Sequence, residues 1–119
     1  MKVLLAVDGS DHSSEAVRAL KYLRRPDELT LLHVGAAPRP AYPMMVPEVA
    51  QELYSQLERS MKEDGEQLLT RIHSLLPPHS GPVTKQLALG SPAEMIVATA
   101  ESRHVGLILM GARGLGPVK

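Results

Sequence analysis

Residues 3–10 decide the fold: Val-Leu-Leu-Ala-Val is followed at once by Asp8-Gly9-Ser10. A continuous apolar run that ends in turn-forming residues is typical of a strand covered on both faces, as in a parallel sheet. Ser10 favours the N-cap of a helix, and the apolar residues between 16 and 23 have helical spacing. Pro26 stops that helix from continuing. The opening of the chain therefore predicts a strand, a sharp turn and a helix.

The same alternation continues along the rest of the chain. Three more apolar segments are predicted as strands, at residues 29–34, 83–89 and 105–110. Two helical patterns separate them, one over 47–76 and one that Ser91 caps and that ends near Ser102. The order β-α-β-α-β-α-β predicts a single α/β domain over residues 1–119, with a doubly wound parallel sheet.

Two finer expectations follow from polar and small residues inside these segments. Lys85 and Gln86 interrupt the third predicted strand, which indicates a strand with one exposed side at the edge of the sheet. Gly65 lies within the long helical pattern, where glycine costs about 1 kcal/mol relative to alanine. A bend or a close backbone approach is therefore expected there.

Composition excludes several classes of function. Thirteen Lys and Arg balance thirteen Asp and Glu, so no basic excess is available to bind nucleic acid. The chain has no cysteine, which excludes disulfides, thiolate metal sites and cysteine nucleophiles. Its apolar runs are too short for a signal-peptide core or a membrane span. We expect a soluble cytoplasmic protein with no membrane partner.

Two loops leave apolar strands with small or polar residues, at 8–10 and 111–116. Ligands of doubly wound sheets bind outside the carboxyl ends of the strands, where the winding reverses. Glycines let backbone N–H groups approach a phosphate, and Arg113 adds a positive charge. The spacing Gly-x-x-Gly-x-Gly is neither a dinucleotide fingerprint nor a Walker loop, so glycine content alone also leaves an ordinary turn open.

Four segments together resemble the universal stress protein family. They are Val-Leu-Leu-Ala-Val-Asp-Gly-Ser at 3–10, Leu-Leu-His-Val at 31–34, Gly-Ser-Pro-Ala-Glu at 90–94 and Leu-Ile-Leu-Met-Gly-Ala-Arg-Gly-Leu-Gly at 107–116. The resemblance implies a Rossmann-like parallel sheet in the order 3-2-1-4-5. Gly111 and Gly114 match the first half of the family's nucleotide motif, Gly-x-x-Gly, nine residues, then Gly and Ser or Thr.

The resemblance also implies a ligand and the residues that hold it. The expected ligand is ATP or AMP, with or without Mg²⁺, in a regulatory stress-response role and without catalytic residues. Ala6, Val7 and Asp8 would border the adenosine, and Val34 would meet the adenine. The ribose and phosphates would lie against Met110, Gly111, Arg113 and Gly114.

The sequence departs from the family pattern at its end. Lys119 comes before the second half of the motif, and before the family's last helix and fifth strand. The expectation is therefore a truncated domain whose fourth strand, apolar on both faces, becomes an edge. Such an edge favours association, either as a homo-oligomer such as a dimer or with another partner, unless a longer parent protein supplies the missing segment.

Alternatives stay open at this level. The same fold could act as a scaffold that has lost nucleotide binding, or as a slow nucleotide hydrolase. Asp8 could contact a nucleotide or Mg²⁺, or it could only form the turn. His33 is interpreted as a hydrogen-bonded structural residue, His12 as a surface residue, and Ser91 as a helix cap rather than a nucleophile.

Overall fold

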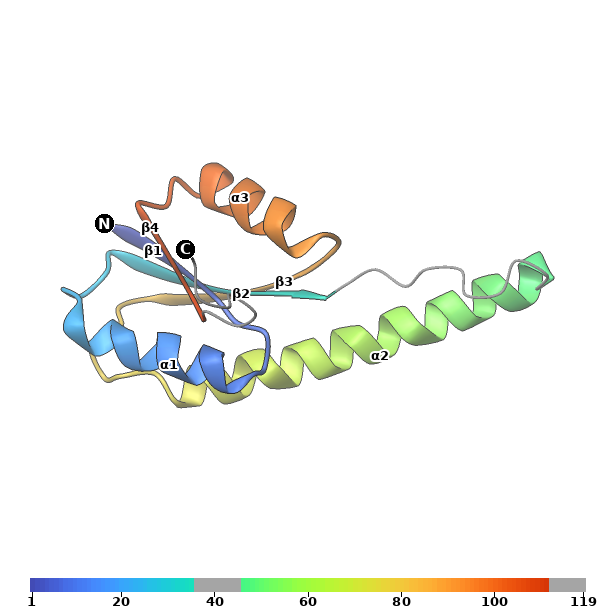
Figure 1. Ribbon diagram of the computed structural model, residues 1–119, viewed down its shortest axis with the longest axis horizontal. Helices are drawn as coiled ribbons and strands as arrows, with labels where there is room; N and C mark the ends of the chain where they lie inside the picture. The colour runs from blue at the N-terminus through green and yellow to red at the C-terminus, as the bar shows by residue number, and fades with distance from the viewer. Residues whose placement is uncertain (36–45, 112–119) are drawn as a thin grey trace, which may run out of the picture.

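The computed structural model describes residues 1–35 and 46–111, and its elements follow the predicted alternation (Figure 1). The strands are β1 (Lys2–Ala6), β2 (Glu28–Gly35), β3 (Val83–Leu89) and β4 (Leu107–Met110). The helices are α1 (Asp11–Ala19), the 3₁₀ turn η1 (Leu20–Tyr22), α2 (Pro47–Ser74) and α3 (Pro92–Ser102). The predicted α/β class is confirmed.

All pairings in the four-stranded sheet are parallel, and the strand order is β3-β2-β1-β4. This order matches the first four strands of the predicted sheet, and β3 lies at an edge as expected. β1 is central: its residue Ala6 pairs with Leu32 of β2 on one side and with Met110 of β4 on the other. Three strand ends are therefore neighbours.

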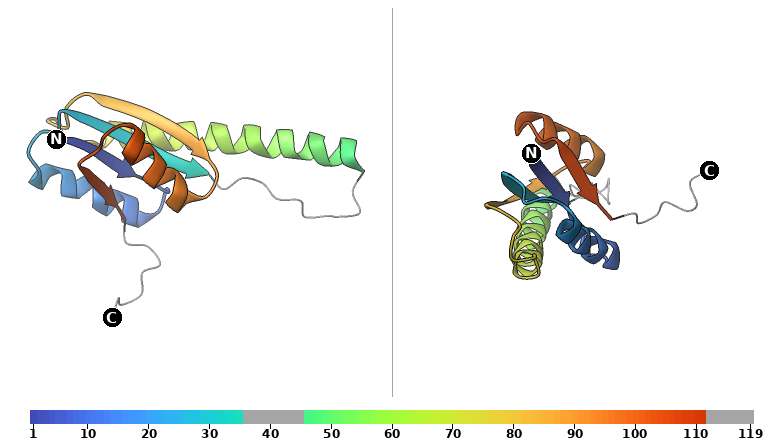
Figure 2. Two further views of the ribbon diagram at one scale, coloured as in Figure 1. Left: turned by 90° about the horizontal axis from the view of Figure 1, so that it is seen from above. Right: turned by 90° about the vertical axis from the view of Figure 1, so that its left-hand side faces the viewer.

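Helices cover the two faces of the sheet unequally (Figures 1 and 2). On one face, α1 packs on β1 and β4 while α2 packs on β2 and β3. A large apolar cluster fills this face. Its buried members are Val3, Leu5, Val7, Ala16, Val17, Leu20, Leu29, Leu31, Leu69 and Ile72. On the other face α3 packs on β2 and β3 over a smaller buried cluster of Leu4, Ala6 and Leu32.

Gly65 shows the close backbone approach that the sequence allowed. This residue is buried within α2, and a Cβ atom added to it would lie 2.6 Å from Leu87 Cδ1 and 3.1 Å from His33 Cδ2. Side chains of β2 and β3 therefore occupy the space that any larger residue would need. Glycine lets the long helix lie directly on the sheet.

Both predicted serine caps occupy the right position, but neither hydroxyl makes the capping bond. Ser10 and Ser91 are the N-cap residues of α1 and α3 in extended backbone geometry, and neither makes a side-chain capping bond. Ser10 Oγ instead donates to Asp8 Oδ1 at 2.6 Å. The first helix also ends earlier than Pro26 requires, because the chain tightens into η1 after Ala19.

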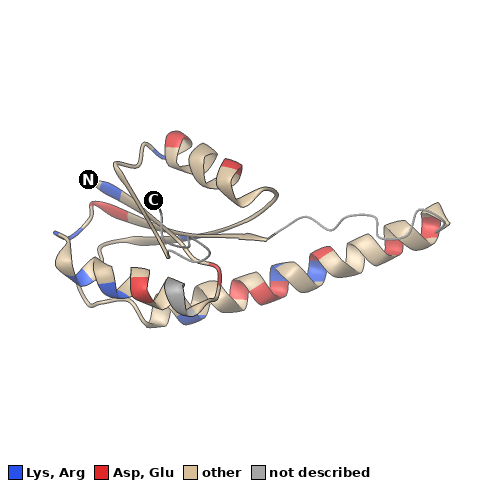
Figure 3. Ribbon diagram, viewed as in Figure 1, with Lys and Arg blue, Asp and Glu red and all other residues tan. Residues whose placement is uncertain are grey.

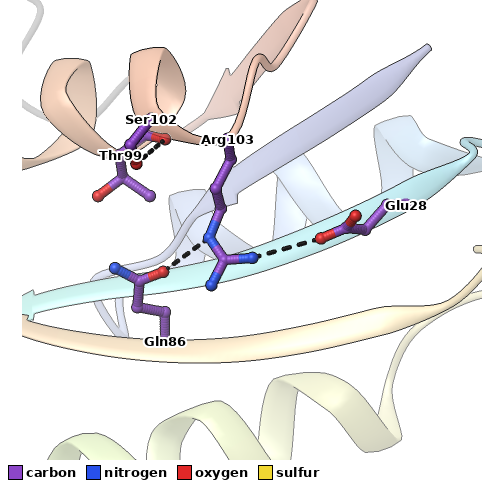
Figure 4. Close-up of polar contacts among 5 residues, drawn as sticks. All are labelled: Glu28, Gln86, Thr99, Ser102 and Arg103. Carbon is purple, nitrogen blue, oxygen red and sulfur yellow. Dashed lines mark hydrogen bonds and ion pairs between the residues drawn. The ribbon is translucent and has the colours of Figure 1, made fainter.

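Arg103 ties the end of α3 to the sheet, as Figure 4 shows. Its Nε donates to Gln86 Oε1 of β3 at 2.9 Å, and its Nη1 lies 3.3 Å from Glu28 Oε1 of β2. Both partners of the ion pair are about two-thirds shielded from water, with 32% of each side chain exposed. One side chain therefore bridges the helix to two strands.

Charged residues gather along α2, whereas β4 carries none (Figure 3). The exposed positions of the long helix hold acidic and basic side chains in mixture, which is typical of a solvated helix face. Within residues 1–35 and 46–111, no helix combines the length and apolar character needed to cross a membrane.

Candidate functional site

A pocket of about 180 Å³ lies where the carboxyl ends of β1, β2 and β4 approach the start of α3. The residues that line it are Ala6, Val7, Asp8, Ser13, Leu32, Val34, Pro92, Ile96, Met110 and Gly111. This is the end of a doubly wound sheet at which ligands bind. Asp8 and Gly111, the first residues of the two loops that the sequence analysis singled out, both line the pocket.

Six of the eight predicted site residues line this pocket. They are Ala6, Val7, Asp8, Val34, Met110 and Gly111. Arg113 and Gly114 lie outside the described residues. The pairing of Ala6 with Met110 explains how residues about one hundred positions apart come together. Contact of these residues with a nucleotide stays a prediction.

The floor and one wall of the pocket are apolar. Ala6 and Leu32 belong to the buried cluster on the α3 face, and Val34 packs against it. Ile96, on the first turns of α3, closes one side, while Met110 remains 57% exposed at the rim. This composition suits a flat, weakly polar group better than a charged one.

Asp8 forms the polar corner of the pocket, and its Oδ1 accepts three hydrogen bonds. The donors are the Ser10 N–H at 2.9 Å, Ser10 Oγ at 2.6 Å and Ser13 Oγ at 2.8 Å. The bond from the Ser10 N–H closes the turn that the Asx interpretation of Asp8 predicted. The carboxylate is exposed and also borders the pocket, so the turn and a ligand contact are compatible.

Ser13 is a site residue that the sequence argument missed. Only 2% of it is exposed, and its Oγ accepts the Asp8 N–H at 2.8 Å while donating to Asp8 Oδ1. A signal was present: Ser13 precedes Ala16, Val17 and Leu20 by three, four and seven residues, which places it on the apolar face of α1. A buried hydroxyl needs a polar partner, and Asp8 is that partner.

His33 has the structural role that the sequence predicted. Its Nδ1 lies 2.7 Å from the carbonyl oxygen of Val7, the residue that follows β1. The ring sits on the face of the sheet that α2 covers, away from the pocket. Among the residues whose side chains the structure describes (1–10, 13–35 and 46–111), no cluster of three His, Asp or Glu residues could hold a metal ion.

The carboxyl group of Asp27, at the opposite end of the sheet, has a lowered pKa. The hydrogen bond from the α-amino group of Met1, at 2.6 Å, lowers the pKa of Asp27 below its ordinary value of 3.8. Lys2 and Glu28, the next residues along the chain, pair at the amino ends of β1 and β2. This perturbed group therefore has no part in the pocket.

The family of the chain is shown by its match to known sequences. The model of the universal stress protein family matches residues 1–119, and the chain belongs to that family. A universal stress protein of Thermus aquaticus is 36% identical over 118 residues, which cover 98% of this chain and 80% of that protein.

Solved structures give the same fold. The hypothetical protein MJ0577 superposes with a TM-score of 0.76 at 26% identity, covering 99% of this chain and 78% of that one. A universal stress protein family protein from Arabidopsis thaliana, with AMP bound, superposes with a TM-score of 0.68 at 20% identity. That match covers 100% of this chain and 81% of the other, and at this identity it shows the fold alone.

Proposed function

We propose that this chain binds an adenine nucleotide, ATP or AMP, in the pocket between Asp8 and Gly111, as a regulatory module rather than an enzyme. The observation that carries the proposal is the convergence of three strand ends on one pocket with an apolar floor and a polar corner. The AMP-bound relative from Arabidopsis thaliana supports the choice of ligand.

The size and lining of the pocket suggest which part of the nucleotide it encloses and which part lies outside it. Its volume of about 180 Å³ is below the roughly 300–1,000 Å³ of pockets that enclose drug-sized ligands. We therefore expect the adenine to be enclosed between Val34 and Ile96, with the ribose beside Asp8. The phosphates would lie over Gly111 and the residues after it, where Arg113 adds charge and Gly114 allows backbone approach.

Titration calorimetry with adenosine, AMP and ATP, each with and without Mg²⁺, tests the proposal. We expect micromolar or weaker binding, about 8 kcal/mol or less, for the nucleotides. Because the base would supply most of the enclosed contact, adenosine should retain a measurable part of the affinity. No heat of binding for any of the three at millimolar concentration would refute the function.

Two neighbouring residues of α3 provide a matched pair of variants. Ile96 lines the pocket, whereas Val97 is 52% exposed and faces a separate surface groove. Ile96→Glu puts a carboxylate where the base should lie and should weaken nucleotide binding at least tenfold, because the charge would have to be desolvated. Val97→Glu should leave the affinity within about twofold of wild type. Equal effects of the two variants would place the ligand elsewhere.

Slow turnover would not change this assignment, but rapid turnover would. Multiple-turnover phosphate release at about 1 s⁻¹ or faster, within the ordinary enzymatic range, would favour the hydrolase alternative. We expect release far below that rate, because the one hydroxyl–carboxylate pair among the described pocket residues, Ser13 and Asp8, is engaged in the turn: Ser13 is 2% exposed, and its Oγ accepts the Asp8 N–H while donating to Asp8 Oδ1.

The exposed edge of β4 favours a second function, association between copies. Ile108 and Met110 are 38% and 57% exposed, and both point to the α3 face, where Val97 is also exposed. An apolar edge strand of this kind offers unpaired backbone groups and apolar surface to a partner strand. Sedimentation should show a dimer that Ile108→Lys dissociates, whereas a clean monomer at high concentration would exclude self-association.

A further inference from the structure

Both backbone polar groups of Val7, the residue that follows β1, are held by hydrogen bonds. Its N–H donates to the Leu32 carbonyl oxygen at 2.9 Å, and its own carbonyl oxygen meets His33 Nδ1 at 2.7 Å. Leu32 and His33 are successive residues of β2, so one short segment fixes both backbone groups of Val7. The next residue is Asp8, the polar corner of the pocket.

The His33 contact defines which ring nitrogen carries a proton. A carbonyl oxygen can only accept a hydrogen bond, so Nδ1 must be the donor. The side chain therefore supplies one N–H to the carbonyl group of Val7, a residue of which only 4% is exposed. A buried carbonyl that loses its partner pays its full desolvation penalty, so the carbonyl of Val7 favours staying in contact with His33.

The position of the ring is set from the other side by α2. A Cβ atom at Gly65 would lie 3.1 Å from His33 Cδ2, so the imidazole occupies the space that this glycine leaves open. The ring is thus confined between helix α2 and the end of β1.

We propose that His33 is a positioning residue for the pocket: from the opposite face of the sheet, it fixes the Val7 carbonyl and so the turn at Asp8. Asp8 N–H and Oδ1 both bond to Ser13, and Oδ1 also holds Ser10. A shift of the Val7 peptide would move this whole set of hydrogen bonds. The identity of the ligand in this proposal rests on the proposed function. The effect of His33 on the turn rests only on the hydrogen bonds and packing described above.

The test uses variants that differ in where they place a donor. His33→Asn keeps an N–H close to the position of Nδ1, His33→Gln moves it toward the position of Nε2, and His33→Leu removes it. Two measurements are made on each: ATP affinity by calorimetry, and amide hydrogen exchange of Ser10 and Ser13 in the nucleotide-free protein. Thermal unfolding shows that each variant is folded before it is compared.

We expect His33→Leu and His33→Gln to weaken ATP binding about tenfold and to speed exchange at both amides. His33→Asn should restore the affinity to within about threefold of wild type and keep slow exchange. If His33→Leu does not fold, the Asn and Gln pair carries the same comparison. A role that is only structural would change stability without this pattern of rescue.

Three results would overturn the proposal. They are unchanged exchange in all variants, an Asn variant as weak as the Leu variant, and a Leu variant that binds ATP as wild type does. If wild-type protein binds no nucleotide, the proposed function fails, and the exchange rates of the nucleotide-free variants alone then decide whether His33 fixes the turn.

Discussion

On one face of the sheet, α1 and α2 bury β1 and β2 under a cluster of ten apolar residues; on the other, α3 packs on β2 and β3 above a buried cluster of three. The first face is closely packed at Gly65, where even an added Cβ atom would not fit. The second face contains the candidate pocket and the exposed residues Ile108 and Met110.

This difference indicates that one face mainly stabilises the domain and that the other provides space for a ligand. Close packing of apolar groups supplies most of the stability of a domain, and it leaves no space for a ligand. Binding requires the reverse, a place where the packing stops. In this chain the two requirements are met by alternate residues of the same strands, because successive side chains of a strand point to opposite faces.

The largest expected effect compares Leu31 with Leu32. Both are fully buried neighbours in β2, but Leu31 faces the closed side and Leu32 lines the pocket. Leu31→Ala should leave a sealed cavity and lower the free energy of unfolding by about 4 kcal/mol. Leu32→Ala enlarges a space that already opens to solvent, so we expect a loss of about 2 kcal/mol. Urea unfolding of both variants measures the difference, and equal losses would contradict the contrast between the faces.

A smaller effect is expected at Gly65. Replacing glycine by alanine within a helix normally stabilises it by about 1 kcal/mol. Here the added methyl group meets Leu87 and His33, so Gly65→Ala should lower the free energy of unfolding by about 1 kcal/mol. Ser60→Ala, at an exposed position of the same helix, serves as the control and should stabilise slightly. A gain in both variants would show that α2 is not closely packed at Gly65.

The smallest effect concerns Arg103, which anchors the helix on the open face. Arg103→Met keeps the length of the side chain but loses the bonds to Gln86 and Glu28. We expect a loss of about 1 kcal/mol or less, because the ion pair is partly solvated. Amide exchange should rise in α3 and stay unchanged in α1. Uniform exchange changes across both helices would mean that Arg103 does not anchor α3 specifically.

The fold was predictable because each strand, turn and helix is indicated by residues within its own segment, namely by apolar runs and turn-forming residues. The run at residues 3–7 is typical of a strand covered on both faces, and the alternation of elements then predicts a parallel sheet. The rule for strand ends brings Asp8 and Gly111 together only if the first and fourth strands are neighbours, and the strand order that the family resemblance implies makes them so. The backbone part of the candidate site therefore follows from the sequence.

The walls of the pocket were not predictable in the same way. Ile96 closes the pocket only because α3 packs at one particular position on the sheet, and helix spacing alone does not state that position. The bond from Arg103 to Glu28 joins residues 75 positions apart, and no local sequence pattern predicts such a contact. The hydroxyl of Ser10 can either accept a backbone N–H as a helix cap or donate to the carboxylate of Asp8, and the local geometry decides for Asp8.

Helix α2 extends well past the end of the sheet that supports it (Figures 1 and 2). Its 28 residues span about 42 Å, whereas the eight residues of β2 span about 26 Å. Because the helix contacts the sheet closely at Gly65, a small tilt about this point displaces the distant end of the helix. A tilt of about 5° moves Val49, which is about 24 Å away, by about 2 Å. A spectroscopic label near Val49 would therefore report small changes in the tilt of α2 relative to the sheet as larger displacements.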